Sequence, residues 1–119
     1  MKLSTHQLRQ FDKEGYIIIP ELFSAEEVAV LKGEIPSIFS QHRDENIREK
    51  DSQTVRTAFA THTYNDVYSR FVCHPKILEP AEQLLEGHVY VHQFKLNAKA
   101  AFNGDVWQWH QDFGIWHRD

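Results

Sequence analysis

Two side chains near the end of the 119-residue sequence have the types and the spacing of metal ligands. In "VWQWHQDF" (106–113), one residue separates His110 from Asp112. If this segment is a β-strand, residues two apart point to the same side, so an imidazole and a carboxylate face one point. They form two thirds of the facial triad that holds Fe(II) in non-haem oxygenases and leaves the opposite positions open. The short triplet is also compatible with a structural pair, or with a Zn²⁺ module that adds His117.

A second group of polar residues lies on the preceding segment. The alternation in "HVYVHQFKLNAKAAF" (88–102) predicts a strand with Gln93, Asn97 and Lys99 on one face. An iron site that uses 2-oxoglutarate needs a cation or amide donors near the metal to hold the carboxylates of this cosubstrate. Lys99 and Asn97 are of these types. From the pattern alone, Lys99 is equally compatible with a solvated strand lysine.

In these two segments, the residues that alternate with the candidate site residues are predicted to pack in the core. "FNGD" predicts a tight turn around Gly104, followed by a strand over "VWQWHQDF". Trp107 and Trp109 alternate with His110, so we expect them to pack between sheets or in the core. The even-numbered residues of the first segment form the other expected core face: Tyr90, His92, Phe94, Leu96, Ala98 and Ala100.

Helix signals dominate the N-terminal part of the chain. Ser4 with Gln7, and Ser24 with Glu27, have the spacing of capping boxes, so each pair predicts a helix N-terminus. The first helix is expected to end at the glycine of "DKEG", and the second carries an apolar stripe on one face. Pro36 is expected to kink or restart the second helix.

The middle of the chain combines short strands, a loop and one further helix. "YIIIP" (16–20) and "VRTAFAT" (55–61) predict strands, because β-branched residues or alternation dominate them. The polar segment 40–53 predicts an exposed loop or a lid. Pro75 is expected to start a helix that ends near Gly87.

Composition restricts the class of protein and of partner. The chain is 41% hydrophobic and has a net charge of −4, which indicates a globular domain and argues against nucleic acid or an anionic membrane as a partner. Its single cysteine excludes an intrachain disulfide. The N-terminus lacks the apolar run of a signal peptide, and no later segment is apolar enough to span a membrane. We therefore expect a cytoplasmic protein.

Three stretches together resemble a known family. These are "FDKEGYIIIPELFSAEEVAVLKGEI", "HPKILEPAEQLLEGHVYVHQFKLNAKAAF" and "WHQDFGIWHRD". They are similar to the N-terminal half of the phytanoyl-CoA dioxygenase family, and most of all to its ectoine-hydroxylase-like members. The resemblance covers nearly the whole chain. The combination of "HQFKLNAK" with "WHQDFGIWH" is much more specific than the His-x-Asp triplet.

The resemblance implies an α+β fold, with N-terminal helices followed by the first strands of a double-stranded β-helix (jelly roll). Residues 1–119 would form the N-terminal part of one domain, helical with short strands over 1–87 and carrying the metal motif on the first core strands over 88–119. The implied activity is hydroxylation of a small-molecule metabolite with Fe(II), 2-oxoglutarate and O₂. By this resemblance, His110 and Asp112 would be iron ligands. Lys99 and Asn97 would contact 2-oxoglutarate, and Gln93 and Trp116 would contact the substrate.

The resemblance also implies parts that this sequence does not contain. The third iron ligand of the family, a histidine, and the arginine that pairs with 2-oxoglutarate lie far downstream of the region matched here. We therefore expect a truncated chain with an unpaired sheet edge, prone to self-association and inactive on its own. The alternatives are a non-catalytic truncated homologue that acts as a binding or regulatory partner, and a simple metal-binding module.

Overall fold

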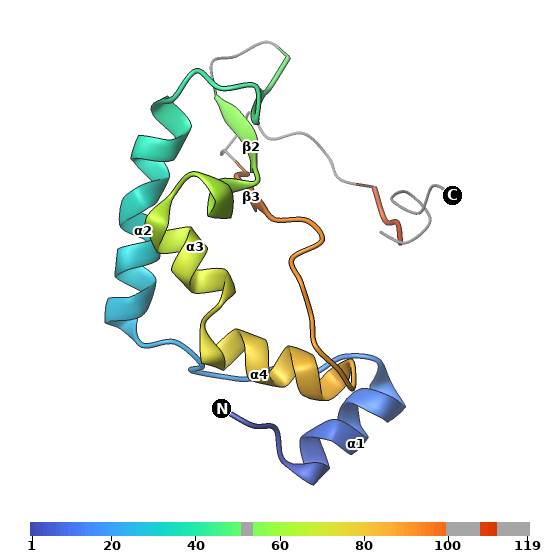
Figure 1. Cartoon of the computed structure of the whole chain (residues 1–119). Helices are drawn as coiled ribbons and strands as arrows, with labels where there is room; N and C mark the ends of the chain where they lie inside the picture. Colours follow the sequence, from blue (N-terminus) through green and yellow to red (C-terminus); the bar gives the residue numbers. More distant parts are fainter. Residues whose placement is uncertain (51–53, 100–107, 112–119) are drawn as a thin grey trace.

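The computed structural model describes residues 1–50, 54–99 and 108–111, and these form helices and a small antiparallel sheet beside them (Figure 1). The α+β class is thereby confirmed. In chain order the elements are α1 (Thr5–Glu14), α2 (Ala25–Ser40), β1 (Asn46–Arg48), β2 (Val55–Phe59), the 3₁₀ helix η1 (Thr61–Thr63), α3 (Asp66–Val72), α4 (Pro75–Leu84) and β3 (Lys95–Asn97).

The two predicted capping boxes are confirmed. In α1 the Ser4 hydroxyl accepts from the Gln7 N–H, and the Gln7 side chain accepts from the Ser4 N–H at 2.9 Å. In α2 the Ser24 N–H donates to Glu27 Oε2 at 2.7 Å, and the Ser24 hydroxyl accepts from the Glu27 N–H. Gly15 ends α1 at φ 77°, a left-handed conformation that favours glycine. Local sequence therefore sets these helix boundaries.

The prolines act differently from one another. Pro75 occupies the first turn of α4, as predicted, where its missing N–H costs nothing. Pro36 lies inside α2, and the helix continues through it to Ser40, so the expected restart is wrong. Pro36 has no N–H to donate to the Lys32 carbonyl. Because Lys32 is exposed, water can solvate this carbonyl instead.

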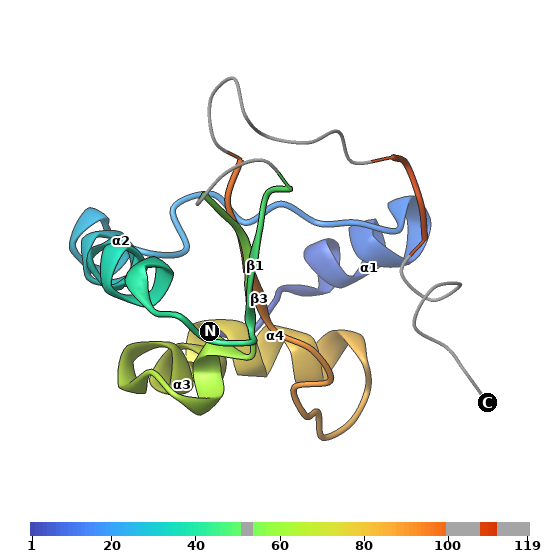
Figure 2. The ribbon, with the colours of Figure 1, turned by 90° about the horizontal axis from the view of Figure 1, so that it is seen from above.

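The sheet has the strand order β1-β2-β3, and both pairings are antiparallel. Ala58 of β2 lies opposite Asn46 of β1 and opposite Leu96 of β3. A register shift between Ile47 and Arg48 interrupts the first pairing. The sheet stands edge-on in Figure 2, with α2 and α3 on one side of it. The sheet therefore has one face turned toward these helices and one turned away.

The core lies between the sheet and these helices. Ile38, Ala58 and Tyr68 are its buried residues, and Phe94 and Leu96 pack against them. The Tyr68 hydroxyl donates to the Leu31 carbonyl at 2.9 Å, and burial raises the pKa of this phenol. Phe94 and Leu96 lie on the core side, as their parity predicts.

Asn46 connects the sheet to the end of α2. Its buried Nδ2 donates to the Ile38 carbonyl at 2.8 Å and to the Gln41 carbonyl at 2.9 Å. The Ile38 carbonyl also accepts from the Gln41 N–H at 3.3 Å, so Asn46 adds a second donor there and supplies one to the carbonyl of Gln41, the residue that caps the helix. The expectation of a loop throughout 40–53 is wrong for β1, because backbone pairing with β2 outweighs the polar composition of this segment.

Other predicted strands are absent or shorter. Residues 16–19 belong to no strand, and Ile18 is 73% exposed, so the strand predicted over 16–20 is wrong. The strand predicted over 88–102 is confirmed only at Lys95–Asn97. Tyr90 is 82% exposed, so its assignment to the core is wrong. β-Branched and alternating residues favour a strand only where a partner strand is present, and residues 16–19 and 88–94 pair with none of the described strands.

The segment after β3 also differs from the prediction. Residues 108–111 are not in a strand, and Trp109 is fully exposed rather than packed. Trp107 and the turn around Gly104 lie outside the described residues. Within the part of the chain that the structure describes, no helix is long and apolar enough to cross a membrane.

We predict that Ile38→Ala lowers the free energy of unfolding by about 2–5 kcal/mol, because Ile38 is fully buried and its removal leaves a cavity. Urea denaturation followed by circular dichroism measures the change. Val30→Ala is the matched control, since Val30 lies in the same helix but is 57% exposed. Equal losses in both variants would contradict the placement of the core.

Candidate functional site

Asn97 is the most firmly positioned of the predicted site residues. It lies opposite Thr57 in the β2–β3 pairing, and the Thr57 hydroxyl donates to Asn97 Oδ1 at 3.0 Å. The ladder continues past Asn97, since the Ala98 N–H donates to the Arg56 carbonyl at 2.9 Å. With Oδ1 accepting from Thr57, the amide nitrogen is the group that Asn97 can turn toward an anionic ligand.

Lys99 follows Asn97 by two residues and is exposed. Leu96 packs toward α2 and α3, so Asn97, its neighbour in the strand, lies on the opposite face. The exposed side chain of Asn97 therefore lies on the face turned away from these helices, beside the buried Thr57, and Lys99 follows two residues later. An amide donor and a cation so close along the chain suit the binding of a carboxylate.

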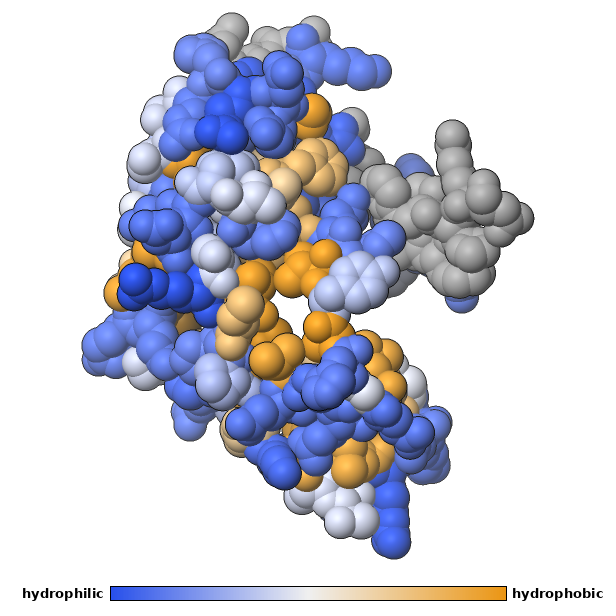
Figure 3. Space-filling view, in the orientation of Figure 1, coloured by the Kyte–Doolittle hydropathy of each residue, from blue (hydrophilic) through white to orange (hydrophobic). Residues whose placement is uncertain are grey.

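Gln93 lies at a cavity of about 820 Å³ between α3, α4 and the segment that leads to β3. Apolar side chains dominate this hollow, which Figure 3 shows in orange near the middle of the visible face. The polar residues His92, Gln93 and Lys95 also line it. The apolar lining includes Phe71, Ile77, Leu78, Ala81, Val89 and Phe94. A concave, mainly apolar surface with a few polar groups is typical of small-molecule sites.

His110 is exposed, and one of its ring nitrogens has a defined partner. Nδ1 lies 2.6 Å from the backbone carbonyl oxygen of Gln108. A carbonyl can only accept, so Nδ1 carries the proton, and the lone pair of the neutral ring is on Nε2. A metal-bound histidine commonly donates its other N–H in this way. The imidazole is therefore in a form that suits coordination through Nε2.

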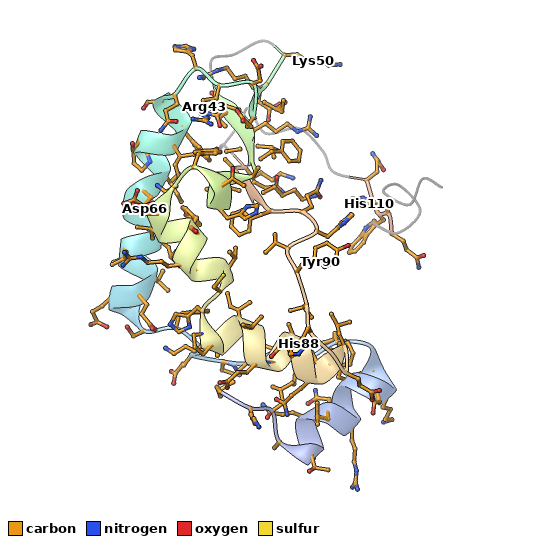
Figure 4. The ribbon with its side chains drawn as sticks, in the orientation of Figure 1. Arg43, Lys50, Asp66, His88, Tyr90 and His110 are labelled. Atoms are coloured by element: carbon orange, nitrogen blue, oxygen red, sulfur yellow. The ribbon has the colours of Figure 1, made fainter. Side chains whose placement is uncertain are left out.

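The structure does not bring all predicted site residues together. Residues 108–111 lie to one side of the sheet in Figures 1 and 2, and Figure 4 draws His110 away from β3. Among the residues placed in the structure, no three His, Cys, Asp or Glu side chains form a metal-binding group. Asp112 and Trp116, predicted as an iron ligand and a substrate contact, lie outside the described residues.

The donor chemistry that is present fits the groups predicted from the sequence. His110 offers the neutral nitrogen that Fe(II) accepts as a ligand. Asn97 and Lys99 offer the N–H donors and the positive charge that a dicarboxylate requires. Thr57, which orients Asn97, was not identified from the sequence. The alternation of 55–61 indicated a strand but contained no information about the residue opposite.

Comparisons with known proteins agree with the family resemblance noted in the sequence. A family model described as phytanoyl-CoA dioxygenase matches residues 11–119. L-Proline trans-4-hydroxylase of Streptomyces griseoviridis is 38% identical over 110 residues, which cover 92% of this chain and 41% of that protein. Ectoine dioxygenase of Bordetella parapertussis is 37% identical over 121 residues, covering 97% of this chain and 39% of that protein. The chain thus spans about two fifths of the length of these relatives.

Solved structures match at the level of the fold and of sequence. The crystal structure of EctD from S. alaskensis with 2-oxoglutarate and 5-hydroxyectoine has a TM-score of 0.89 and 34% identity to this chain. The match covers 97% of this chain and 42% of that chain. The structure of the same protein with bound Fe matches with the same TM-score and identity. Helices and sheet are therefore arranged here as in part of an iron-binding protein.

We predict that Thr57→Val frees the Asn97 side chain and lowers the free energy of unfolding by about 0.5–1.5 kcal/mol, because a side-chain hydrogen bond is lost without a change in volume. Denaturation measures the loss, and the side-chain amide resonances of Asn97 report its orientation. Thr63→Val is the control, since the Thr63 hydroxyl donates to the Ala60 carbonyl and not to Asn97. Unmoved Asn97 amide resonances in Thr57→Val would contradict the assignment.

Proposed function

Because the chain belongs to the phytanoyl-CoA dioxygenase family, we propose that the protein is an Fe(II)- and 2-oxoglutarate-dependent hydroxylase of a small-molecule metabolite. The observation that carries this proposal is the likeness to EctD, crystallised with Fe and with 2-oxoglutarate, in a chain that also has the His-x-Asp triplet. The activity is proposed for the complete domain, on a double-stranded β-helix to which residues 1–119 contribute the helices and the first core strands.

His110 and Asp112 are the proposed iron ligands. An imidazole and a carboxylate form part of a facial triad, which leaves the opposite positions of the metal open. The backbone carbonyl of Gln108 holds the His110 ring with its proton on Nδ1, and this supports coordination through Nε2. When bound, the iron with 2-oxoglutarate and O₂ supplies the oxidising power that hydroxylates a C–H bond, while the protein orients and shields the reactants.

Lys99 and Asn97 are the proposed contacts of 2-oxoglutarate. The Lys99 ammonium would neutralise a carboxylate, and the Asn97 amide would donate a hydrogen bond beside it. Thr57 supports this role of Asn97 by holding its oxygen, which leaves the amide nitrogen to face the cosubstrate. The pairing of β2 with β3 thus pre-orients one of the two groups before the anion binds.

Gln93 and Trp116 are the proposed substrate contacts. Gln93 lies at the cavity between α3, α4 and the segment leading to β3 and would bind a polar group of the substrate. The relatives carry the names L-proline trans-4-hydroxylase and ectoine dioxygenase, so a compact polar metabolite is the proposed substrate class. L-Proline and ectoine are the first two compounds to test.

We predict that His110→Ala and Asp112→Ala each abolish succinate formation from 2-oxoglutarate, because each removes one of the ligands that hold the iron. Succinate is measured by chromatography in the complete domain supplied with Fe(II) and the two candidate substrates. His88→Ala is the matched control, since this exposed histidine lies outside the motif and pairs with Glu82. Full turnover in either ligand variant would refute the metal assignment.

The same preparations distinguish the proposed enzyme from a simple metal-binding module. Binding of Fe(II) is measured anaerobically by calorimetry, with and without 2-oxoglutarate. The proposal requires Fe(II) binding that strengthens when the cosubstrate is present. Zn²⁺ binding of the same strength with and without 2-oxoglutarate, together with no succinate, would favour the module instead.

We predict that Lys99→Met raises the KM for 2-oxoglutarate by roughly 10- to 100-fold, because a charged hydrogen-bonding partner contributes about 1.5–3 kcal/mol. Methionine preserves the length of the side chain and removes its charge. Lys50→Met is the control, since Lys50 is exposed and follows the other edge strand, β1. An unchanged KM in Lys99→Met would assign this lysine to the solvated surface.

A further inference from the structure

A histidine caps the N-terminus of α4, close to the N-terminus of α2 and the end of α3. His74 precedes α4, and its Nδ1 accepts a hydrogen bond from the Lys76 N–H at 3.1 Å. Because Pro75 has no N–H, the Lys76 N–H is the first backbone donor of this helix. The side chain of His74 therefore satisfies a donor that α4 itself leaves without a partner.

This cap requires one protonation state of the ring. A backbone N–H can only donate, so Nδ1 must carry a lone pair, and the proton of the neutral ring must be on Nε2. Nε2 faces Glu27 of α2, with 3.9 Å between Nε2 and Oε1. A carboxylate on this side favours a hydrogen on Nε2. At 3.9 Å the two atoms form no hydrogen bond, so the Lys76 N–H at Nδ1 sets the tautomer and the charge of Glu27 is compatible with it.

Two further contacts hold the Glu27 side chain, one within α2 and one with α4. It closes the capping box of α2, and the Lys76 ammonium lies 2.8 Å from Oε1 and 2.6 Å from Oε2. The Lys76 hydrogen bond holds the pKa of this carboxyl below its ordinary value, so Glu27 stays charged where a histidine titrates. One carboxylate therefore connects the N-termini of α2 and α4.

Aromatic rings pack beside this histidine. The Phe23 ring lies 5.7 Å from the His74 ring and 5.5 Å from the Phe71 ring of α3, measured between centroids. The Lys76 ammonium lies 5.3 Å from the Phe23 centroid. Within the described ranges, the charged groups near the imidazole are Glu27 from α2 and Lys76 from α4, and the ring contact comes from Phe23.

We propose that His74 is a proton-sensitive cap, which stabilises the first turn of α4 when neutral and releases it when protonated. Protonation places a hydrogen on Nδ1, directly opposite the Lys76 N–H, and the hydrogen bond is lost. It also adds a positive charge at the positive end of the α4 dipole and beside the Lys76 ammonium. Glu27 attracts the imidazolium but cannot restore an acceptor at Nδ1.

The first turn of α4 matters for the cavity described above. Ile77 and Leu78 follow Lys76 directly, and both line this cavity. Their N–H groups bond to the His74 carbonyl at 2.8 and 2.9 Å, so the backbone of His74 anchors the same turn. Release of the cap on protonation of His74 would therefore loosen one wall of the cavity.

The tautomer is tested first, in the unmodified protein. Long-range ¹H–¹⁵N correlation spectra assign the protonated ring nitrogen of each histidine. At about pH 8 the inference requires the proton of His74 on Nε2 and a lone pair on Nδ1. A proton on Nδ1 would overturn it, because that nitrogen could not accept from the Lys76 N–H.

The proton dependence is tested by amide exchange of Lys76, corrected for its intrinsic rate. Between about pH 8 and about pH 5 its protection should fall roughly fivefold, the loss expected for a helix cap. In His74→Asn the protection should stay constant, because asparagine caps a helix without titrating. His88→Asn is the matched control, since His88 pairs with Glu82 of the same helix but caps nothing there; it should behave like the unmodified protein. Constant protection in the unmodified protein, or an equal fall in His74→Asn, would refute the proposal.

Discussion

The antiparallel pairing of β2 with β3 is the constraint on which the arrangement of this molecule depends. β2 is the central strand, and its Ala58 lies between Asn46 on one side and Leu96 on the other. Because side chains alternate across a strand, this register sends Leu96 toward Ile38 and Tyr68 in the core. The same register places Asn97 on the other face of the sheet, where Thr57 is its partner across the two strands. A shift by one residue would exchange the two faces and remove both the core contact and the candidate cosubstrate contact.

The helices reach this sheet through polar contacts that join distant parts of the chain. The Asn46 amide binds two carbonyls at the end of α2, and Glu27 near the start of α2 binds Lys76 of α4. Such contacts add direction to a small hydrophobic core. They align α2 with the sheet at one end and with α4 at the other. Fixed in this way, α4 forms one wall of the cavity at which Gln93 lies.

The starts of α1, α2 and α4 were predictable from sequence, whereas α3 and the strand lengths were not. Both capping boxes and the start of α4 depend on residues within a few positions of each other, so the pattern contains all the groups that interact. A strand also needs a partner that is distant in sequence. Residues 16–19 and 88–94 have the composition of strands but lack a partner strand among the described residues. Asn46–Arg48 lies in a polar stretch of sequence but has a partner strand in β2.

The sequence by itself determined the types of chemical group at the candidate site: the His-x-Asp triplet, the amide and ammonium at 97 and 99, and the alternation that separates Asn97 from the core. Only the tertiary structure decided which partner orients each group. Thr57 holds the Asn97 oxygen across the sheet, and Glu27 of α2 binds the Lys76 ammonium of α4. The physical reason is that a hydrogen bond depends on distance and direction between two atoms. For Thr57 and Asn97, or Glu27 and Lys76, these are fixed only when segments far apart in the chain pack together.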